Sequence, residues 1–169
     1  MDVPCVTLAK IRKGRAMSEQ ASGISPTEIA ADVIVQGDGK AFKQEIYGRS
    51  HRIAADEPAA VGGADAGPTP YDLLLAALGA CTSVTLTMYA QRKGWPLEGV
   101  TVWLRHSRIH AADCAECETK FGMLDQIERD LRIAGPLDAE QKARLLDIAD
   151  KCPVHRTLTS EVVIRTHEV

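Results

Sequence analysis

Two cysteines of this chain lie in settings with very different local chemistry. Cys81 falls within a long uncharged run, where a thiol is normally inert because loss of water disfavours the thiolate. Cys152 opens the segment Cys-Pro-Val-His-Arg-Thr-Leu. If Pro153 begins a short helix, Cys152 lies at the amino end of that helix, where the helix dipole, His155 and Arg156 all favour the thiolate. Local chemistry therefore makes Cys152 the better activated thiol, and the two sites together suggest a thiol–disulfide redox device.

Each cysteine also has a simpler interpretation. On a regular helix Cys81 can pack in the core as a small apolar residue. It would share a helix face with five residues: Leu74, Ala77, Leu78, Thr85 and Met88. Cys152 can equally be a turn residue without a chemical role. These alternatives stay open at the level of residue types and spacing.

The bulk properties of the chain exclude several classes of protein. Its 169 residues fit a single domain, which we place at 26–169 after a mobile leader at 1–25. A net charge of −3 without a basic stripe argues against a nucleic-acid partner. Five scattered cysteines do not resemble a secreted disulfide framework, so we expect reduced thiols in the cytoplasm. The uncharged run at 73–90 contains several threonines and a glycine, which favours a buried central helix over a membrane span.

The pattern of residues predicts an α+β fold without repeats. The central helix has clear limits: Thr69 can cap it, Pro70 suits its first position, and Gly94 suits a left-handed cap after Arg92 and Lys93. Alternation and turn signals predict the remaining elements. These are strands at 29–35, 41–46, 51–56, 100–109, 127–133 and 159–165, and a second long helix at 137–149.

A second cysteine pair, Cys114 and Cys117, lies in a polar loop after the strand at 100–109. His106 and His110 precede it, so the four residues form a candidate zinc set. A redox pair and an ordinary solvated loop are the alternatives, since a lone Cys-x-x-Cys is weak evidence and its acidic neighbours do not activate thiolates. A hydrolase is disfavoured because the chain has no Gly-x-Ser-x-Gly elbow.

The two principal cysteine motifs resemble the OsmC/Ohr family. The first is Thr-Pro-Tyr-Asp-Leu-Leu-Leu-Ala-Ala-Leu-Gly-Ala-Cys, which ends at Cys81, and the second is Cys-Pro-Val-His from Cys152. Asp-Glu-Pro at 56–58 and Gly-Gly at 62–63 also resemble the OsmC-like branch. The resemblance covers about 29–169. It implies strongly curved antiparallel sheets wrapped around two long central helices in an intertwined homodimer.

The resemblance also implies an activity, the thiol-dependent reduction of organic hydroperoxides during oxidative stress. Cys81 corresponds to the peroxidatic cysteine and Cys152 to the resolving cysteine. A thiolate attacks the peroxide, and the sulfenic acid then condenses with the second thiol. A dithiol reductant, of lipoyl type in related proteins, restores the pair by exchange. No cofactor is implied.

Two positions depart from the pattern of the peroxidases in this family. They carry a glutamate where this chain has Tyr71, and the neighbouring Asp72 is better explained as a charge at the helix amino end. They also use an arginine from the first hairpin, and the matching place here is near Gly37. The candidates for activating the thiolate are therefore Lys40, Arg49, Arg52 and His155. The alternative function is a non-catalytic dimer that binds an apolar small molecule or senses oxidation.

Overall fold

A computed structural model describes residues 30–168. Contacts divide the chain into two compact units with a boundary between Gly67 and Pro68, here called unit 1 and unit 2. The predicted leader at 1–25 lies outside the described residues, and the single domain at 26–169 stays a prediction. Helices and antiparallel strands occur in separate stretches of the chain, which confirms the α+β class.

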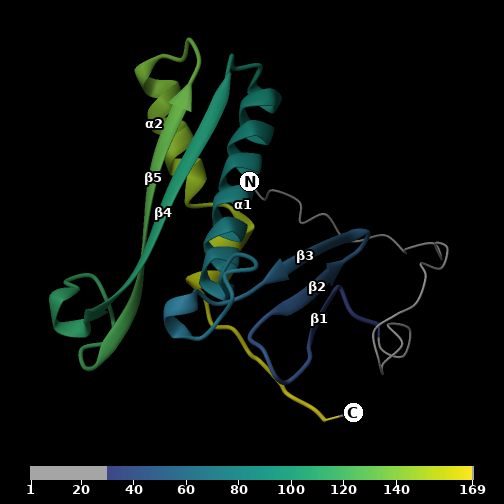
Figure 1. Cartoon of the computed structure of the whole chain (residues 1–169). Helices are drawn as coiled ribbons and strands as arrows, with labels where there is room; N and C mark the ends of the chain where they lie inside the picture. The colour runs from purple at the N-terminus through teal and green to yellow at the C-terminus, as the bar shows by residue number, and fades with distance from the viewer. Residues whose placement is uncertain (1–29, 169) are drawn as a thin grey trace. The chain divides into compact units, whose positions relative to one another are not determined.

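Unit 1 contains a three-stranded antiparallel sheet with strand order β1-β2-β3 (Figure 1). Its strands are β1 (Val33–Gly37), β2 (Gln44–Gly48) and β3 (His51–Ala55). The predicted Asp-Gly turn joins β1 to β2, and the Asp38 carboxylate accepts hydrogen bonds from the N–H groups of Lys40 and Ala41, both at 2.9 Å. β1 and β2 begin later than predicted, because pairing with a neighbouring strand, rather than residue type, decides where a ladder starts.

Asp56 organises the loop that follows β3. Its side chain is buried, and its carboxylate accepts hydrogen bonds from the N–H groups of Glu57, Ala64 and Ala66 at 2.8, 3.0 and 3.2 Å. Burial raises the pKa of Asp56, but the three N–H groups outweigh it and lower the pKa below its ordinary value. The loop therefore folds around a carboxylate that remains charged. A short 3-10 helix lies within it (Ala59–Val61).

Unit 2 begins with the long helix α1 (Pro70–Lys93), whose predicted limits are confirmed. Thr69 and Asp72 form a capping box, in which the Thr69 hydroxyl accepts from the Asp72 N–H and the Asp72 carboxylate accepts from the Thr69 N–H. Gly94 ends the helix with a positive φ of 65°, a conformation that residues other than glycine rarely adopt. Asp72 is therefore a helix-capping charge, as predicted.

A long two-stranded ribbon packs against α1 within unit 2. It pairs β4 (Gly99–His110) with β5 (Met123–Ala134), and inward residues alternate with outward ones along both strands. α1 approaches β4 closely at Gly79, where a Cβ atom would lie 2.8 Å from a methyl carbon of Leu104. A second 3-10 helix (Ala111–Asp113) leads from β4 into the polar loop that precedes β5.

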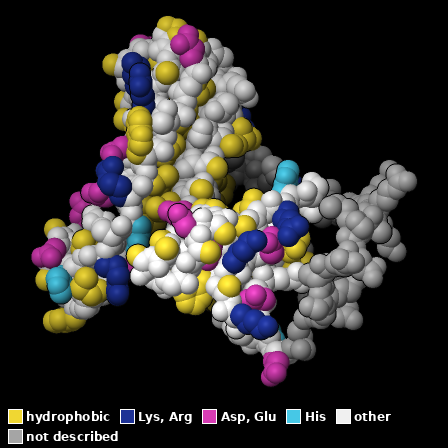
Figure 2. Space-filling view, viewed as in Figure 1, with side chains coloured by type: hydrophobic (Ala, Val, Ile, Leu, Met, Phe, Trp, Pro, Cys, Tyr) yellow, Lys and Arg dark blue, Asp and Glu magenta, His cyan; other side chains and the backbone are white. Residues whose placement is uncertain are grey.

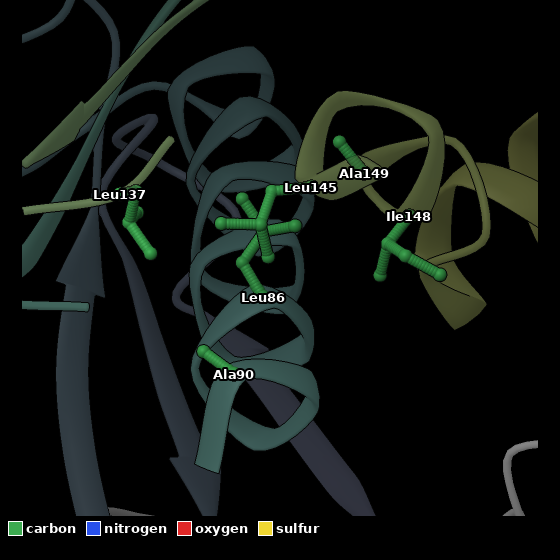
Figure 3. Packing of buried hydrophobic residues seen from close by; sticks show 6 residues of the cluster. All are labelled: Leu86, Ala90, Leu137, Leu145, Ile148 and Ala149. Atoms are coloured by element: carbon green, nitrogen blue, oxygen red, sulfur yellow. The ribbon is translucent and has the colours of Figure 1, made fainter. Parts of the chain in front are cut away.

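Two further helices complete unit 2 and bury its core. They are α2 (Ala139–Ala149) and the short α3 (Pro153–Leu158), and Pro153 is indeed the first residue of a short helix. Leu86 of α1 and Leu145 of α2 are both fully buried (Figure 3). The other buried members of the cluster are Ala90, Leu137, Ile148 and Ala149. By length and composition α1 could cross a membrane, but it packs against β4, α2 and α3 as the core helix of a globular unit does.

The strand predicted at 159–165 is wrong. The described residues from Glu161 onward form no strand, and Val162, Val163 and Ile164 are 55%, 71% and 84% exposed. Their β-branched side chains favour an extended chain, but a strand also needs a neighbouring backbone with which to form hydrogen bonds. No neighbouring strand of the described chain supplies it.

Candidate functional site

The structure brings Cys81 and Cys152 together within unit 2. Both thiols are free, and they lie close enough together that the Cys152 side chain raises the pKa of Cys81. Cys81 lies in the fourth turn of α1, and Cys152 is the residue that precedes the first turn of α3. The side chain buried among core atoms is Cys152, which is 0% exposed, whereas Cys81 is only partly buried. The pattern of residues suggested the opposite order of burial.

Consecutive backbone N–H groups of α3 hold the two sulfurs. The His155 N–H donates to the Cys152 Sγ at 3.3 Å, and the Val154 N–H donates to Cys81. Both groups belong to the first turn of α3, where N–H groups lack partners inside the helix. The Cys-Pro sequence therefore fixes Cys152 and also supplies a donor to Cys81.

Two threonines of α1 complete the surroundings of the thiols. The Thr85 side chain contacts Cys81, and the Thr82 Oγ1 lies 3.7 Å from the Cys152 Sγ. Thr82 donates its single hydroxyl proton to the Leu78 carbonyl at 2.8 Å. Towards Cys152 its oxygen can therefore act only as an acceptor. Thr82 therefore offers the buried Cys152 a polar contact inside the core.

Arg129 of β5 is a further member of the site that the pattern of residues did not single out. Its guanidinium donates to the Thr82 Oγ1 at 3.0 Å, to the Ala149 carbonyl at 3.3 Å and to the Asp150 carboxylate at 2.6 Å. Its side chain is only 12% exposed. Arg129 thus joins β5, α1 and the end of α2 beside the buried Cys152.

The signal for Arg129 was present in the strand pattern. Ile127, Arg129, Leu131 and Ile133 alternate along one face, and the structure turns all four inward. A charged residue at an inward position needs buried partners, because burying an unpaired charge is costly. The sequence did not reveal that those partners are Thr82 and Ala149.

Burial and the groups around Cys81 shift its pKa in opposite directions. Burial raises its pKa above the ordinary value near 9.0, while the Val154 N–H lowers it. The neighbouring Cys152 raises the pKa further, and the Thr85 side chain lowers it. The result is a raised pKa, so the neutral thiol is the main form of Cys81 at neutral pH.

The candidates for thiolate activation fall in both units. Lys40 and Arg49 lie in turns of unit 1, and Arg52 of β3 forms an ion pair with Glu45 at 2.9 Å. Their action on Cys81 stays a prediction, because they and the thiols belong to different units. His155 lies in unit 2, where its backbone N–H contacts Cys152 directly.

The structure does not bring the four residues of the candidate zinc set together. Cys114 and Cys117 form a disulfide, and the His106 Nε2 lies 2.9 Å from an Asp125 carboxylate oxygen. His110 is the last residue of β4 and is exposed. Within 30–168, no cluster of three or more histidine, cysteine or acidic side chains is arranged to hold a metal ion.

Tyr71, at the position of the family's glutamate, stacks on His106 with the ring centroids 4.3 Å apart. A separate groove lies between the end of α1 and α2, beside Tyr89, Trp95 and Arg144. It contains neither Cys81 nor Cys152. We take the two thiols as the candidate functional site because the groove offers no comparable nucleophile.

Comparisons with known proteins agree with this fold. An OsmC-like protein family matches residues 62–167, more than half of the chain. An OsmC-like protein from Mycoplasma pneumoniae has a similar structure, with a TM-score of 0.58 at 20% identity over 78% of this chain and 89% of that chain. No curated protein matches the sequence.

Two organic hydroperoxide resistance proteins also share the fold. OsmC from Legionella pneumophila has a TM-score of 0.56 at 18% identity, over 79% of this chain and 91% of that chain. OhrB from Bacillus subtilis has a TM-score of 0.53 at 19% identity, over 78% and 91%. At these identities the likeness concerns the fold, and the family match carries the assignment. The chain belongs to the OsmC-like family.

Proposed function

We propose that this protein is a thiol-dependent peroxidase that reduces organic hydroperoxides to alcohols through Cys81 and Cys152. Membership of the OsmC-like family supports a redox role connected with peroxides. The observation that carries the proposal is the proximity of two free thiols, one on α1 and one at the amino end of α3. A sulfenic acid formed on one of them would have its resolving thiol already in place.

Exposure supports Cys81 as the thiol that meets the peroxide. Cys81 is partly exposed, whereas Cys152 is fully buried and lies beside Thr82. The Cys81 thiolate attacks the outer oxygen of the hydroperoxide and breaks the O–O bond. The alkoxide leaves and takes up a proton to become the alcohol, and Cys81 becomes a sulfenic acid.

Cys152 then closes the oxidative half of the cycle. Its sulfur attacks the sulfenic sulfur of Cys81, which releases water and forms the Cys81–Cys152 disulfide. A dithiol, for which we propose a lipoyl-type compound in the cytoplasm, returns two electrons by exchange. It leaves as a cyclic disulfide and restores both protein thiols.

An apolar face of α1 supports the proposal of a homodimer. Tyr71, Leu74, Val84 and Met88 are 52%, 37%, 56% and 45% exposed, although α1 is the core helix of unit 2. Such a face favours contact with another apolar surface. We propose that a second copy of the chain covers it. The apolar surroundings of Cys81 would then favour an organic peroxide over hydrogen peroxide.

Peroxide consumption tests this function directly. The full-length protein is supplied with cumene hydroperoxide and either dihydrolipoamide or dithiothreitol, and its turnover is compared with that of Cys81→Ser and Cys152→Ser. We expect no turnover from Cys81→Ser. Cys152→Ser should accumulate a sulfenic acid on Cys81 that dimedone traps. Wild-type turnover no faster than that of Cys81→Ser would refute the proposal.

The second candidate function is a sensor of oxidation. The groups that dominate the pKa of Cys81 are neutral, and without a neighbouring cation its thiolate is scarce at neutral pH. A sensor would consume about one equivalent of peroxide per chain and then stop, with the Cys81–Cys152 disulfide stable to the dithiol. This outcome would refute the catalytic cycle, but the same pair of thiols would remain the site of oxidation.

A further inference from the structure

A second pair of cysteines lies at the outer end of the β4–β5 ribbon. Cys114 and Cys117 are disulfide-bonded with their Cα atoms 5.4 Å apart, whereas Cys81 and Cys152 are free in the same unit. Both bonded residues are partly exposed, in a loop whose other residues are mostly exposed. A thiol from solution can therefore reach the bond.

The disulfide is not needed to hold this loop. The ladder of β4 and β5 already closes its base at the pair His110 and Met123, and the Ala111 N–H donates to the Gly122 carbonyl at 2.8 Å. The bond joins residues only three positions apart. Closing so short a loop constrains the unfolded chain less than closing a long one. A structural role therefore explains the pair poorly.

The charges around the bond are mostly negative. Asp113, Glu116 and Glu118 flank the two cysteines and are exposed. Figure 2 shows acidic side chains at this end of the ribbon together with basic ones. One cation lies close by: the Lys120 Nζ donates to the Cys117 carbonyl at 2.5 Å. The carboxylates disfavour a thiolate at either cysteine, and Lys120 favours Cys117 over Cys114 as the leaving thiolate.

We propose that Cys114–Cys117 is a second thiol–disulfide exchange site, separate from Cys81 and Cys152, and that it selects neutral or cationic thiols over anionic ones. An attacking thiolate bonds to the Cys114 sulfur and breaks the disulfide, and Cys117 leaves as a thiolate that takes up a proton. A second thiol then attacks the mixed disulfide. Two electrons have passed from two thiols to the protein, which leaves Cys114 and Cys117 reduced and the two reagent thiols joined as a disulfide.

The selectivity follows from the charge of the attacking reagent. A reagent with a carboxylate meets up to three like charges, whereas one with an ammonium group is attracted by them. At roughly 8 Å in water, each such charge–charge interaction changes the local concentration of the reagent, and so the reaction rate, about two- to threefold at low ionic strength. Salt screens charges separated by more than about 8–10 Å, so the preference should shrink as salt is added.

The test follows reduction of this one disulfide in the wild-type protein. Cleavage after lysine and arginine releases residues 109–120 as one peptide that contains Cys114 and Cys117 and no other cysteine. Cysteamine, 2-mercaptoethanol and 3-mercaptopropionate serve as cationic, neutral and anionic thiols. Quenched samples are alkylated, and the mass of this peptide reports the fraction reduced. Each rate is divided by the rate of the same thiol with a neutral reference disulfide.

We expect the normalised rates to fall from cysteamine to 2-mercaptoethanol to 3-mercaptopropionate, with about a threefold step or more between neighbours at low salt. The steps should largely vanish at 0.5 M salt. The double variant E116Q/E118Q should reduce the differences between the three normalised rates at low salt. Glu128→Gln, which removes an exposed carboxylate from the middle of β5, should leave them unchanged.

Three results would overturn the proposal. The first is a peptide that stays oxidised under every thiol while the protein remains folded. The second is normalised rates that do not depend on reagent charge. The third is a purified protein that carries stoichiometric zinc on reduced Cys114 and Cys117. Failure of the peroxidase proposal affects none of these measurements, because Cys81 and Cys152 lie on other peptides.

Discussion

Replacement of Arg129 by methionine tests the structural account of the site. The guanidinium makes three hydrogen bonds, and two of their acceptors, the Thr82 hydroxyl and the Ala149 carbonyl, belong to residues at most 1% exposed. The third acceptor, Asp150, has a side chain that is 67% exposed, so its ion pair should contribute little. Methionine keeps much of the aliphatic stem but none of the donors.

The expected loss of stability follows from the two buried acceptors. A charged hydrogen bond contributes about 1.5–3 kcal/mol, and a buried group left without a partner costs about 1–3 kcal/mol. Because Thr82 keeps its bond to Leu78, we expect a total loss of about 2–4 kcal/mol for R129M. For a chain of this size, that corresponds to a fall in Tm of about 5–15 °C.

Thermal unfolding followed by circular dichroism measures this loss, and the same ribbon supplies a control. Arg105 forms ion pairs with Glu128 and Asp130, but its side chain is 56% exposed, so R105M should lower the Tm only slightly. Asp150→Asn should also have a small effect. If R129M is no more destabilising than R105M, the reasoning that Arg129 bridges the buried site is wrong.

Three further predictions concern Cys81, Asp56 and the core. Because burial raises the pKa of Cys81, alkylation by iodoacetamide should quicken about tenfold per pH unit up to about pH 8, and a plateau near neutrality would contradict the raised pKa. The neutral thiol is the form that folding favours, so this group's contribution to stability should be complete below pH 9.0 and decline as the pH rises through the raised pKa. For Asp56 the pKa shift has the opposite sign, because burial raises its pKa but the loop N–H groups lower it more. The contribution of this carboxylate to folding stability is therefore present above pH 3.8 and is lost as the pH falls through the lowered pKa. Asp56→Asn should accordingly speed hydrogen exchange of the loop amides at neutral pH, and unchanged exchange would show that the charge is not needed. Leu145→Ala should cost about 2–5 kcal/mol in denaturant unfolding, whereas Leu146→Ala, at a position 49% exposed, should cost far less; equal losses would contradict the assigned core.

Elements with strong local signals were predictable from the sequence. The limits of α1 followed from a cap and a proline at one end and Gly94 at the other, because these residues satisfy or end helix hydrogen bonds locally. Alternation along 100–109 and 127–133 likewise predicted β4 and β5. The strand predicted at 159–165 failed because extended residues become a strand only when another backbone pairs with them.

The candidate site was likewise predictable only in part from the sequence. Residue types and their spacing singled out Cys81 and Cys152, and Pro153 indicated that a short helix could begin after Cys152. They could not rank the burial of the two thiols or find Arg129. The burial of a side chain and the identity of its buried hydrogen-bond partners depend on which distant segments pack together. The local spacing of residues carries no information about that packing.

The sequence by itself determined the family, the class of fold and the identity of the two thiols, since each depends on residue types at fixed offsets along the chain. Only the tertiary structure decided that Cys152 is the fully buried sulfur and that burial raises the pKa of Cys81 above its ordinary value. It also decided that Arg129 and Thr82 stand beside Cys152. The physical reason is that desolvation and hydrogen bonding act through space, between α1, β5 and α3, which meet only after the chain has folded.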